Sequence, residues 1–171
     1  ISMRPTGIVM GLQSSFHMFM GRPTYDALAL LPFDEQVEKM KQPEIRAAII
    51  SETSDKLPFE GTALRYEMMF RLEQSDGSLD YEPPFDASVQ QIAKRSGVSE
   101  DAILYDMMME NGGHGYIYVI LVNYGDYNLD FLYELMDNST VIAAGSDAGA
   151  HCGAICDAAM PTFMLSHWTR D

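Results

Sequence analysis

Two unbroken apolar runs, each followed by a loop and a helical pattern, constrain the fold of this chain most strongly. The runs span residues 116–122 (YIYVILV) and 141–144 (VIAA), and the helical patterns that follow span 128–136 and 155–168. Apolar side chains at every position are typical of strands that are buried on both faces, as in parallel sheets. The sequence therefore predicts two consecutive β/α units joined by a right-handed connection.

Two parallel β/α units cannot bury their own faces, so we expect them to belong to a larger sheet. A complete (β/α)8 barrel takes about 250 residues, whereas this chain has 171. We therefore predict an α/β fold that is part of a TIM-like (β/α)8 barrel with an α+β insertion. Residues 1–24 would be a late strand end and loop, 25–95 a mainly helical insertion with a candidate hairpin, and 96–171 the last two β/α units. Because the chain opens without Met and stops just after a helical pattern, both ends are expected to be cut.

Capping residues locate the helices in the middle of the chain. Asp86 or Ser88 caps one helix, and Ser88 with Gln91 fits a capping box. Gly97 ends that helix, and Ser99 caps the next one. Further helices are predicted at 27–31, 34–41 and 43–52, a weak strand at 64–73, and a turn or short helix at 6–12.

The charge of the chain excludes several kinds of partner. Its formal net charge is −14, which argues against nucleic acid and anionic membranes. No apolar run reaches about 18 residues, so no membrane-spanning helix is expected. The first residues do not have the charged and apolar regions of a signal peptide. With only two cysteines, a reducing cytoplasm is the predicted compartment.

Small residues and polar side chains follow the second apolar run, in the order Gly145-Ser146-Asp147-Ala148-Gly149-Ala150-His151. In parallel α/β folds, ligands and catalytic groups gather at the carboxyl ends of the strands. The local sequence leaves two roles open for Asp147: a metal ligand and general base, or a capping carboxylate. Zinc binding by His151, Cys152 and Cys156 would need further ligands, and two buried thiols explain the cysteines more simply.

Several motifs resemble one known family. The run from Gly145 to His151, followed by Ile155-Cys156-Asp157-Ala158, resembles the last β/α unit of the N-acyl-D-amino-acid deacylases, D-aminoacylase-like members of the amidohydrolase superfamily. Supporting similarities extend over most of the chain, and the main ones are Arg4-Pro5-Thr6-Gly7, Arg22-Pro23-Thr24-Tyr25 and Asn123-Tyr124-Gly125-Asp126.

The resemblance implies a barrel hydrolase that uses zinc or another divalent metal to cleave a linear amide. Asp147 would bind the metal or its water and act as general base, while His151, Asn123, Tyr124 and Arg4 would be substrate-binding candidates. The other metal ligands of such enzymes, including a His-x-His pair, are absent from this sequence. They would lie in the rest of the same polypeptide, and the fragment alone would be inactive.

Two alternatives stay open at this point. One is an amidohydrolase that acts on cyclic amides. The other is a non-catalytic interaction domain or enzyme remnant, which would be favoured if the reading frame began at Ile1.

Overall fold

The computed structural model describes residues 1–54, 65–145, 154 and 157–169. The fold is mixed α/β, which confirms the predicted class at that level. Its described strands are β1 (Thr6–Met10), β2 (Met69–Arg71) and β3 (Ile117–Val122), which form one sheet in the order β1-β3-β2. Both neighbours run antiparallel to the central strand β3. No closed barrel is present in the described part of the chain.

The prediction that β3 belongs to a parallel sheet is therefore wrong for its described neighbours. The first four residues of the strand are apolar because a separate core covers each face of the sheet, whereas Leu121 and Val122 at its end are exposed. Ile117 and Val119 belong to one core cluster, whereas Tyr118 and Ile120 belong to the other. Alternate residues of a strand point to opposite faces, so two cores produce the same apolar run as a parallel sheet.

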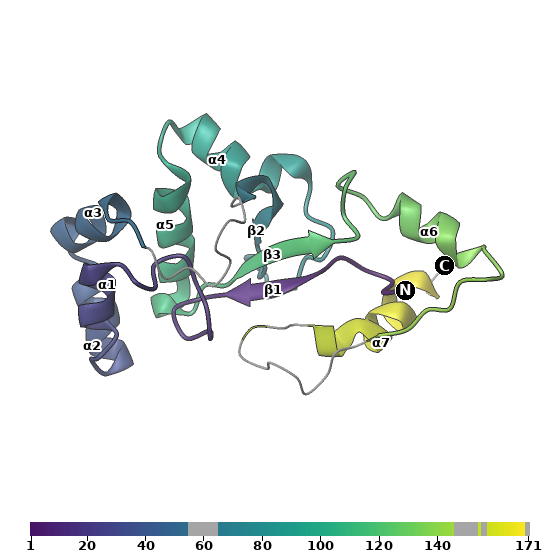
Figure 1. The fold of residues 1–171 in the computed structure, drawn as a ribbon, viewed down its shortest axis with the longest axis horizontal. Coiled ribbons are helices and arrows are strands. Elements are labelled where there is room, and N and C mark those ends of the chain that lie inside the picture. The colour runs from purple at the N-terminus through teal and green to yellow at the C-terminus, as the bar shows by residue number, and fades with distance from the viewer. Residues whose placement is uncertain (55–64, 146–153, 155–156, 170–171) are drawn as a thin grey trace.

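In Figure 1, α1–α3 lie beyond one end of the sheet and α6 and α7 lie toward the other end. The α-helices are α1 (Pro23–Leu28), α2 (Phe33–Met40), α3 (Pro43–Ser51), α4 (Val89–Ser96), α5 (Glu100–Gly113), α6 (Asp130–Met136) and α7 (Met160–Phe163). Short 3-10 helices are η1 (Tyr66–Met68), η2 (Phe85–Ala87) and η3 (Asp157–Ala159), and η4 (Met164–Trp168) is a π-helix. No helix in the described residues is both long enough and apolar enough to cross a membrane.

The predicted helix caps are confirmed. The Ser88 hydroxyl accepts a hydrogen bond from the Gln91 amide and the Ser99 hydroxyl accepts one from the Ala102 amide, each at 3.3 Å. Gly97 ends α4 with φ of 68°, in the left-handed region that glycine adopts without strain.

Three other local predictions need correction. Residues 6–12, predicted as a turn or short helix, contain strand β1. In the predicted strand at 64–73, only Met69–Arg71 is a strand, and the 3-10 helix η1 precedes it. Residues 141–144 do not form one of the described strands, and Ile142 is 78% exposed. The prediction of a strand buried on both faces is therefore wrong.

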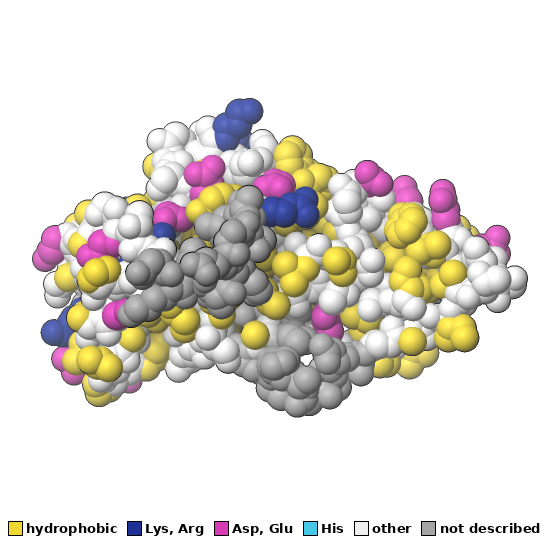
Figure 2. All heavy atoms as spheres, viewed as in Figure 1, with side chains coloured by type: hydrophobic (Ala, Val, Ile, Leu, Met, Phe, Trp, Pro, Cys, Tyr) yellow, Lys and Arg dark blue, Asp and Glu magenta, His cyan; other side chains and the backbone are white. Residues whose placement is uncertain are grey.

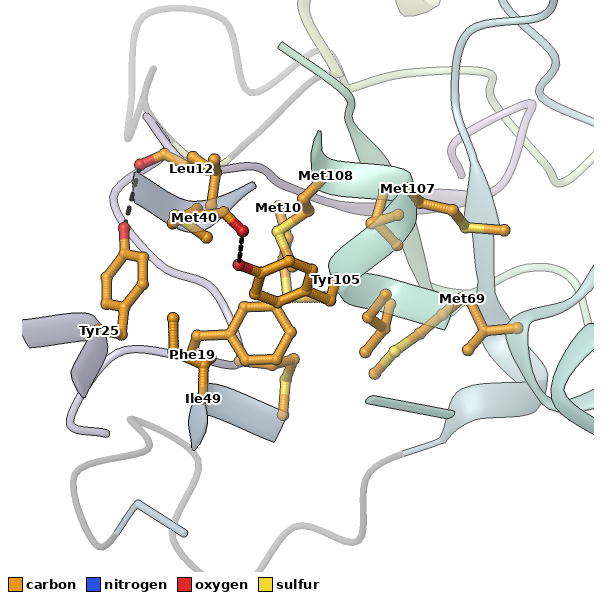
Figure 3. Packing of buried hydrophobic residues seen from close by; sticks show 14 of the residues in the cluster. Met10, Leu12, Phe19, Tyr25, Met40, Ile49, Met69, Tyr105, Met107 and Met108 are labelled. Carbon is orange, nitrogen blue, oxygen red and sulfur yellow. Dashed lines mark hydrogen bonds between the residues drawn. The ribbon is translucent and has the colours of Figure 1, made fainter. Parts of the chain in front are cut away.

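The larger core lies between the sheet and α1–α5 and is rich in methionine. Figure 3 shows the Tyr105 ring beside Phe19 and Met10, with its hydroxyl donating to the Met40 carbonyl at 2.7 Å. Methionine fills irregular gaps between helices because its side chain is unbranched and flexible. The smaller core is aromatic and lies on the opposite face of the sheet, under α6 and α7.

Candidate functional site

The amino-terminal segment, residues 1–10, forms hydrogen bonds with the carboxyl-terminal part of the chain. The Val9 amide donates to the Ala154 carbonyl and the Trp168 indole N–H donates to the Met3 carbonyl, each at 2.7 Å. Figure 1 shows the amino-terminal end of the chain beside α7. Residues that are far apart in the sequence therefore meet along one extended segment.

Ile1 pairs with residues 142–144 in a specific geometry. Its nitrogen donates to the Ile142 carbonyl at 2.7 Å, and its carbonyl accepts from the Ala144 amide at 2.9 Å. In parallel strands, a residue bonds to the two residues that flank its opposite neighbour, as Ile1 does here with Ile142 and Ala144. In antiparallel strands, two opposite residues exchange both bonds with each other. Residues 142–144 therefore run parallel to the start of the chain, although they are not among the described strands.

Asp147 and His151, the sharpest candidates from the sequence, lie outside the described residues, as do Cys152 and Cys156. Their roles stay predictions. The structure describes what holds the two ends of their segment: Ala144 before it is bonded to Ile1, and Ala154 is bonded to Val9.

Arg4, a candidate for binding an anionic substrate group, is fully buried. Its Nη2 atom lies 3.1 Å from Oδ1 of Asp157, which is also buried, and its guanidinium carbon lies 3.9 Å from the centre of the Tyr81 ring. A buried guanidinium needs a counter-charge, and the aromatic face adds a further favourable contact. In this arrangement the Arg4 charge is balanced within the protein and ties the first residues of the chain to the beginning of η3.

Asn123 and Tyr124, also candidates for substrate binding, point to different surroundings. Asn123 has φ of 66° at the end of β3, and its side-chain amide donates to the Ser2 carbonyl at 3.2 Å. Tyr124 is buried in the smaller core, where its hydroxyl donates to the Pro83 carbonyl at 2.9 Å. Burial raises the pKa of the Tyr124 phenol, and the carboxylates of Glu82 and Asp80 raise it further. Asn123 therefore contacts the amino-terminal segment that carries Arg4. The Tyr124 hydroxyl instead lies in the smaller core.

The described residues do not form the metal site that the resemblance implies. Within them, no three His, Cys, Asp or Glu side chains lie close enough together to hold a metal ion. The only candidate ligands that the sequence analysis named, Asp147, His151 and the two cysteines, lie outside the described residues.

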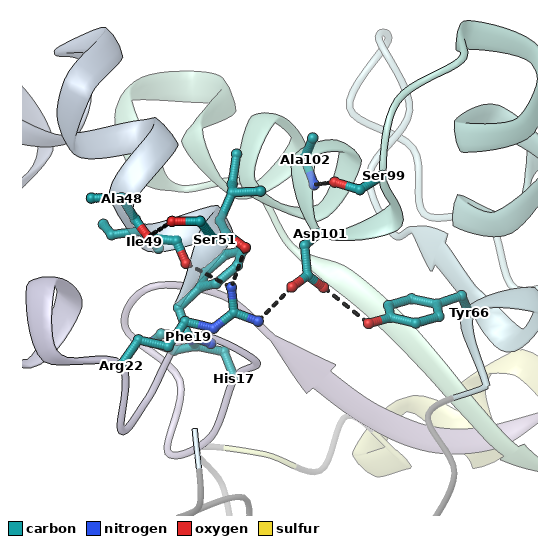
Figure 4. A network of polar contacts seen from close by, with 11 residues as sticks. His17, Phe19, Arg22, Ala48, Ile49, Ser51, Tyr66, Ser99, Asp101 and Ala102 are labelled. Atoms are coloured by element: carbon teal, nitrogen blue, oxygen red, sulfur yellow. Dashed lines mark hydrogen bonds and ion pairs between the residues drawn. The ribbon is translucent and has the colours of Figure 1, made fainter. Parts of the chain in front are cut away.

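The structure reveals two groups of polar residues that sequence reasoning missed. One is the partnership of Arg4 with Asp157 and Tyr81. The other is a network in the helical half of the molecule, where the Arg22 guanidinium bonds to Asp101 at 2.5 Å and to the Ile49 carbonyl at 2.7 Å (Figure 4). Long-range pairs of this kind leave no local signal in a single sequence, because neither partner belongs to a spaced motif.

His17, a loop histidine in the sequence, is fully buried at the edge of that network. Its Nε2 lies 2.8 Å from the Tyr25 hydroxyl, and its Nδ1 accepts a hydrogen bond from the Phe19 amide at 3.2 Å. Because Nδ1 accepts, the neutral ring carries its proton on Nε2. Burial lowers the pKa of His17 to about 4, partly opposed by the carboxylate of Asp26. His17 is therefore neutral and structural at physiological pH.

Comparison with models of protein families, with curated proteins and with solved structures finds no match for this chain. A functional assignment therefore depends on the residues themselves and on the motifs described above.

Proposed function

We propose that this chain is the carboxyl-terminal part of a metal-dependent amidohydrolase whose complete barrel hydrolyses the amide bond of N-acyl-D-amino acids. Asp147 is the residue that handles the reaction's protons. Its carboxylate takes a proton from the attacking water and passes it to the leaving nitrogen. The carbonyl carbon gains the water oxygen, the C–N bond breaks, and the products are a carboxylate and a free amine.

One structural observation supports this proposal best. Arg4 and Asp147 mark the two parts of the chain that carry the resemblance and are 143 positions apart in sequence, yet residues near each of them are in direct contact. Ile1 bonds to Ile142 and Ala144, Val9 bonds to Ala154, and Arg4 pairs with Asp157. An enzyme site at the carboxyl ends of parallel strands requires this proximity.

The parallel bonding of Ile1 with residues 142–144 also supports a barrel. In parallel strands the carboxyl ends meet at the same edge of the sheet, so the chain continues toward the same edge after Ile1 and after Ala144. Asn123 reaches that amino-terminal segment through Ser2, which supports it as a neighbour of the site. The Arg4 guanidinium pairs with the Asp157 carboxylate. Arg4 would therefore stabilise the backbone around the site rather than contact substrate.

The test is the Asp147→Asn variant of the complete polypeptide, assayed with N-acyl-D-amino acids. Turnover should fall by a factor of at least about 100, the lower end of what a proton-transferring residue contributes, while the folded state and the bound metal are retained. Asp137→Asn is the matched control, because Asp137 is an exposed carboxylate at the end of α6. Equal turnover in both variants would refute the role of Asp147, and no hydrolysis by the complete wild-type protein would refute the proposed function.

A further inference from the structure

The carboxyl-terminal end of α6 borders a shallow hollow of about 500 Å³ that shares no residue with the candidate site. Its lining is formed by Tyr133, Glu134, Met136 and Asp137. An aromatic ring, a thioether and two carboxylates therefore surround one hollow at the surface. The helix dipole adds negative potential at the carboxyl-terminal end of a helix, so the hollow favours a cation.

The aromatic wall of this hollow is held in place and remains accessible. The Tyr133 ring lies at 27° to the Trp168 indole, with 6.4 Å between the ring centroids. The Trp168 indole is itself fixed by its hydrogen bond to the Met3 carbonyl. Tyr133 is nonetheless 67% exposed, and Phe131 on the same helix is 55% exposed. An aromatic ring that is supported on one side and open to solvent attracts cations and apolar groups.

The carboxylates of the hollow have no cation beside them in the described part of the chain. The sequence contains no Lys or Arg from residue 96 to residue 169. Glu134 and Asp137 are both exposed, and neither takes part in an ion pair between described residues. By contrast, the exposed carboxylates of Asp106 and Glu110 each pair with an arginine. The negative charge at α6 is therefore available to a partner.

The charge of the whole end of the molecule limits what that partner is. On the face shown in Figure 2, acidic side chains line the end that holds α6, and the described residues of that end show no Lys or Arg. A second copy of the chain also carries a net charge of −14 and would be repelled. Charge complementarity therefore requires a partner with positive side chains.

Arginine matches the lining of the hollow better than lysine does. Its planar guanidinium stacks on aromatic faces and donates paired N–H groups to carboxylates, and its methylene stem packs along apolar groups such as the Met136 side chain. We propose that the hollow at the end of α6 binds an arginine side chain from a basic segment of a partner protein. The guanidinium lies against Tyr133 and donates to Glu134 and Asp137. This docking surface does not depend on the reaction proposed for Asp147.

NMR titration of the complete polypeptide with a capped pentapeptide that carries two arginines tests the proposal. The backbone amides of residues 133–137 should shift most. The double variant Glu134→Gln/Asp137→Asn should raise the Kd about 5-fold, as expected for the loss of two exposed ion pairs. Tyr133→Ala should raise the Kd about 2- to 5-fold, because the peptide loses the aromatic face.

The matched control is the double variant Asp34→Asn/Glu44→Gln. It removes the same amount of charge from exposed carboxylates on α2 and α3, which lie at the opposite end of the molecule (Figure 1). Its Kd should stay within about 2-fold of wild type, because salt screens charges that are far from the peptide.

Equal weakening by the two double variants would overturn the proposal, because attraction to the net charge alone would then explain the binding. No binding to the wild-type protein would also overturn it, including the case in which another part of the polypeptide or a second copy fills the hollow. All of these variants should hydrolyse N-acyl-D-amino acids as wild type does, so the two proposals fail separately.

Discussion

Acidification should destabilise this protein through His17, and the size of the effect follows from its burial. The ring is neutral in the folded state, with Nδ1 accepting from the Phe19 amide and Nε2 bonded to Tyr25. The pKa of His17 is about 4 in the folded protein, against 6.5 for the unperturbed side chain. The unfolded chain therefore takes up the proton near pH 6.5, whereas the folded chain resists it until about pH 4. As a result, the free energy of unfolding falls as the pH falls through this interval.

The magnitude is the pKa difference multiplied by 1.36 kcal/mol for each pH unit, which gives about 3 kcal/mol between pH 7 and pH 4. Urea unfolding at several pH values measures it. Other groups also titrate between pH 7 and pH 4. The informative quantity is therefore the difference in the pH dependence of the unfolding free energy between wild type and His17→Gln, whose glutamine cannot take up a proton.

His114→Gln is the matched control, since His114 is exposed and packs its ring against Phe33. We expect His114→Gln to retain the wild-type pH dependence and His17→Gln to lose about 3 kcal/mol of it. If wild type and His17→Gln lost stability in parallel between pH 7 and pH 4, the reasoning about burial would be refuted.

Two further predictions concern the folded state. Asp157→Asn removes a buried carboxylate charge that pairs with Arg4 and should cost about 3–5 kcal/mol in urea unfolding, and a cost below about 1 kcal/mol would show that the pair is not buried as described. Gly115→Ala places a methyl group against the Met107 carbonyl and should cost about 1–3 kcal/mol. At Gly125 an added methyl group meets nothing within 4 Å, so Gly125→Ala should leave thermal unfolding nearly unchanged, and equal effects of the two substitutions would contradict the close approach.

The elements that could be predicted are those with local signals. Ser88 and Ser99 mark helix starts because their hydroxyls satisfy amides three residues later in the chain. Strand β3 is recognisable from its composition, but its direction is not, because two cores on opposite faces of an antiparallel sheet also require apolar residues throughout.

Strand β1 was missed for a different reason. Gly7 suggests a turn in the sequence, whereas in the structure it allows close approach to the Val119 carbonyl, where a Cβ atom would clash. A glycine that serves packing between strands cannot be distinguished from a turn glycine without knowing the neighbouring strand.

The candidate site was predictable only in part. The motif around Asp147 is a continuous stretch and can be recognised as one, and its catalytic role stays a prediction. The pairing of Arg4 with Asp157 joins residues 153 positions apart, and each is unremarkable in its own neighbourhood. The sequence offers Arg4 as a contact for an anionic substrate group because its guanidinium can bind a carboxylate, whereas its complete burial is a property of the tertiary fold alone.

The long reach of the amino-terminal segment has a consequence for biosynthesis. Its partners lie 113 positions away at Tyr118, 141 at Ile142 and 165 at Trp168. The contacts of this segment therefore form only after the ribosome has added 113 to 165 further residues, and closing such long loops slows folding. During that interval the apolar residues of this segment stay exposed, and exposed apolar surface makes a folding intermediate prone to aggregation.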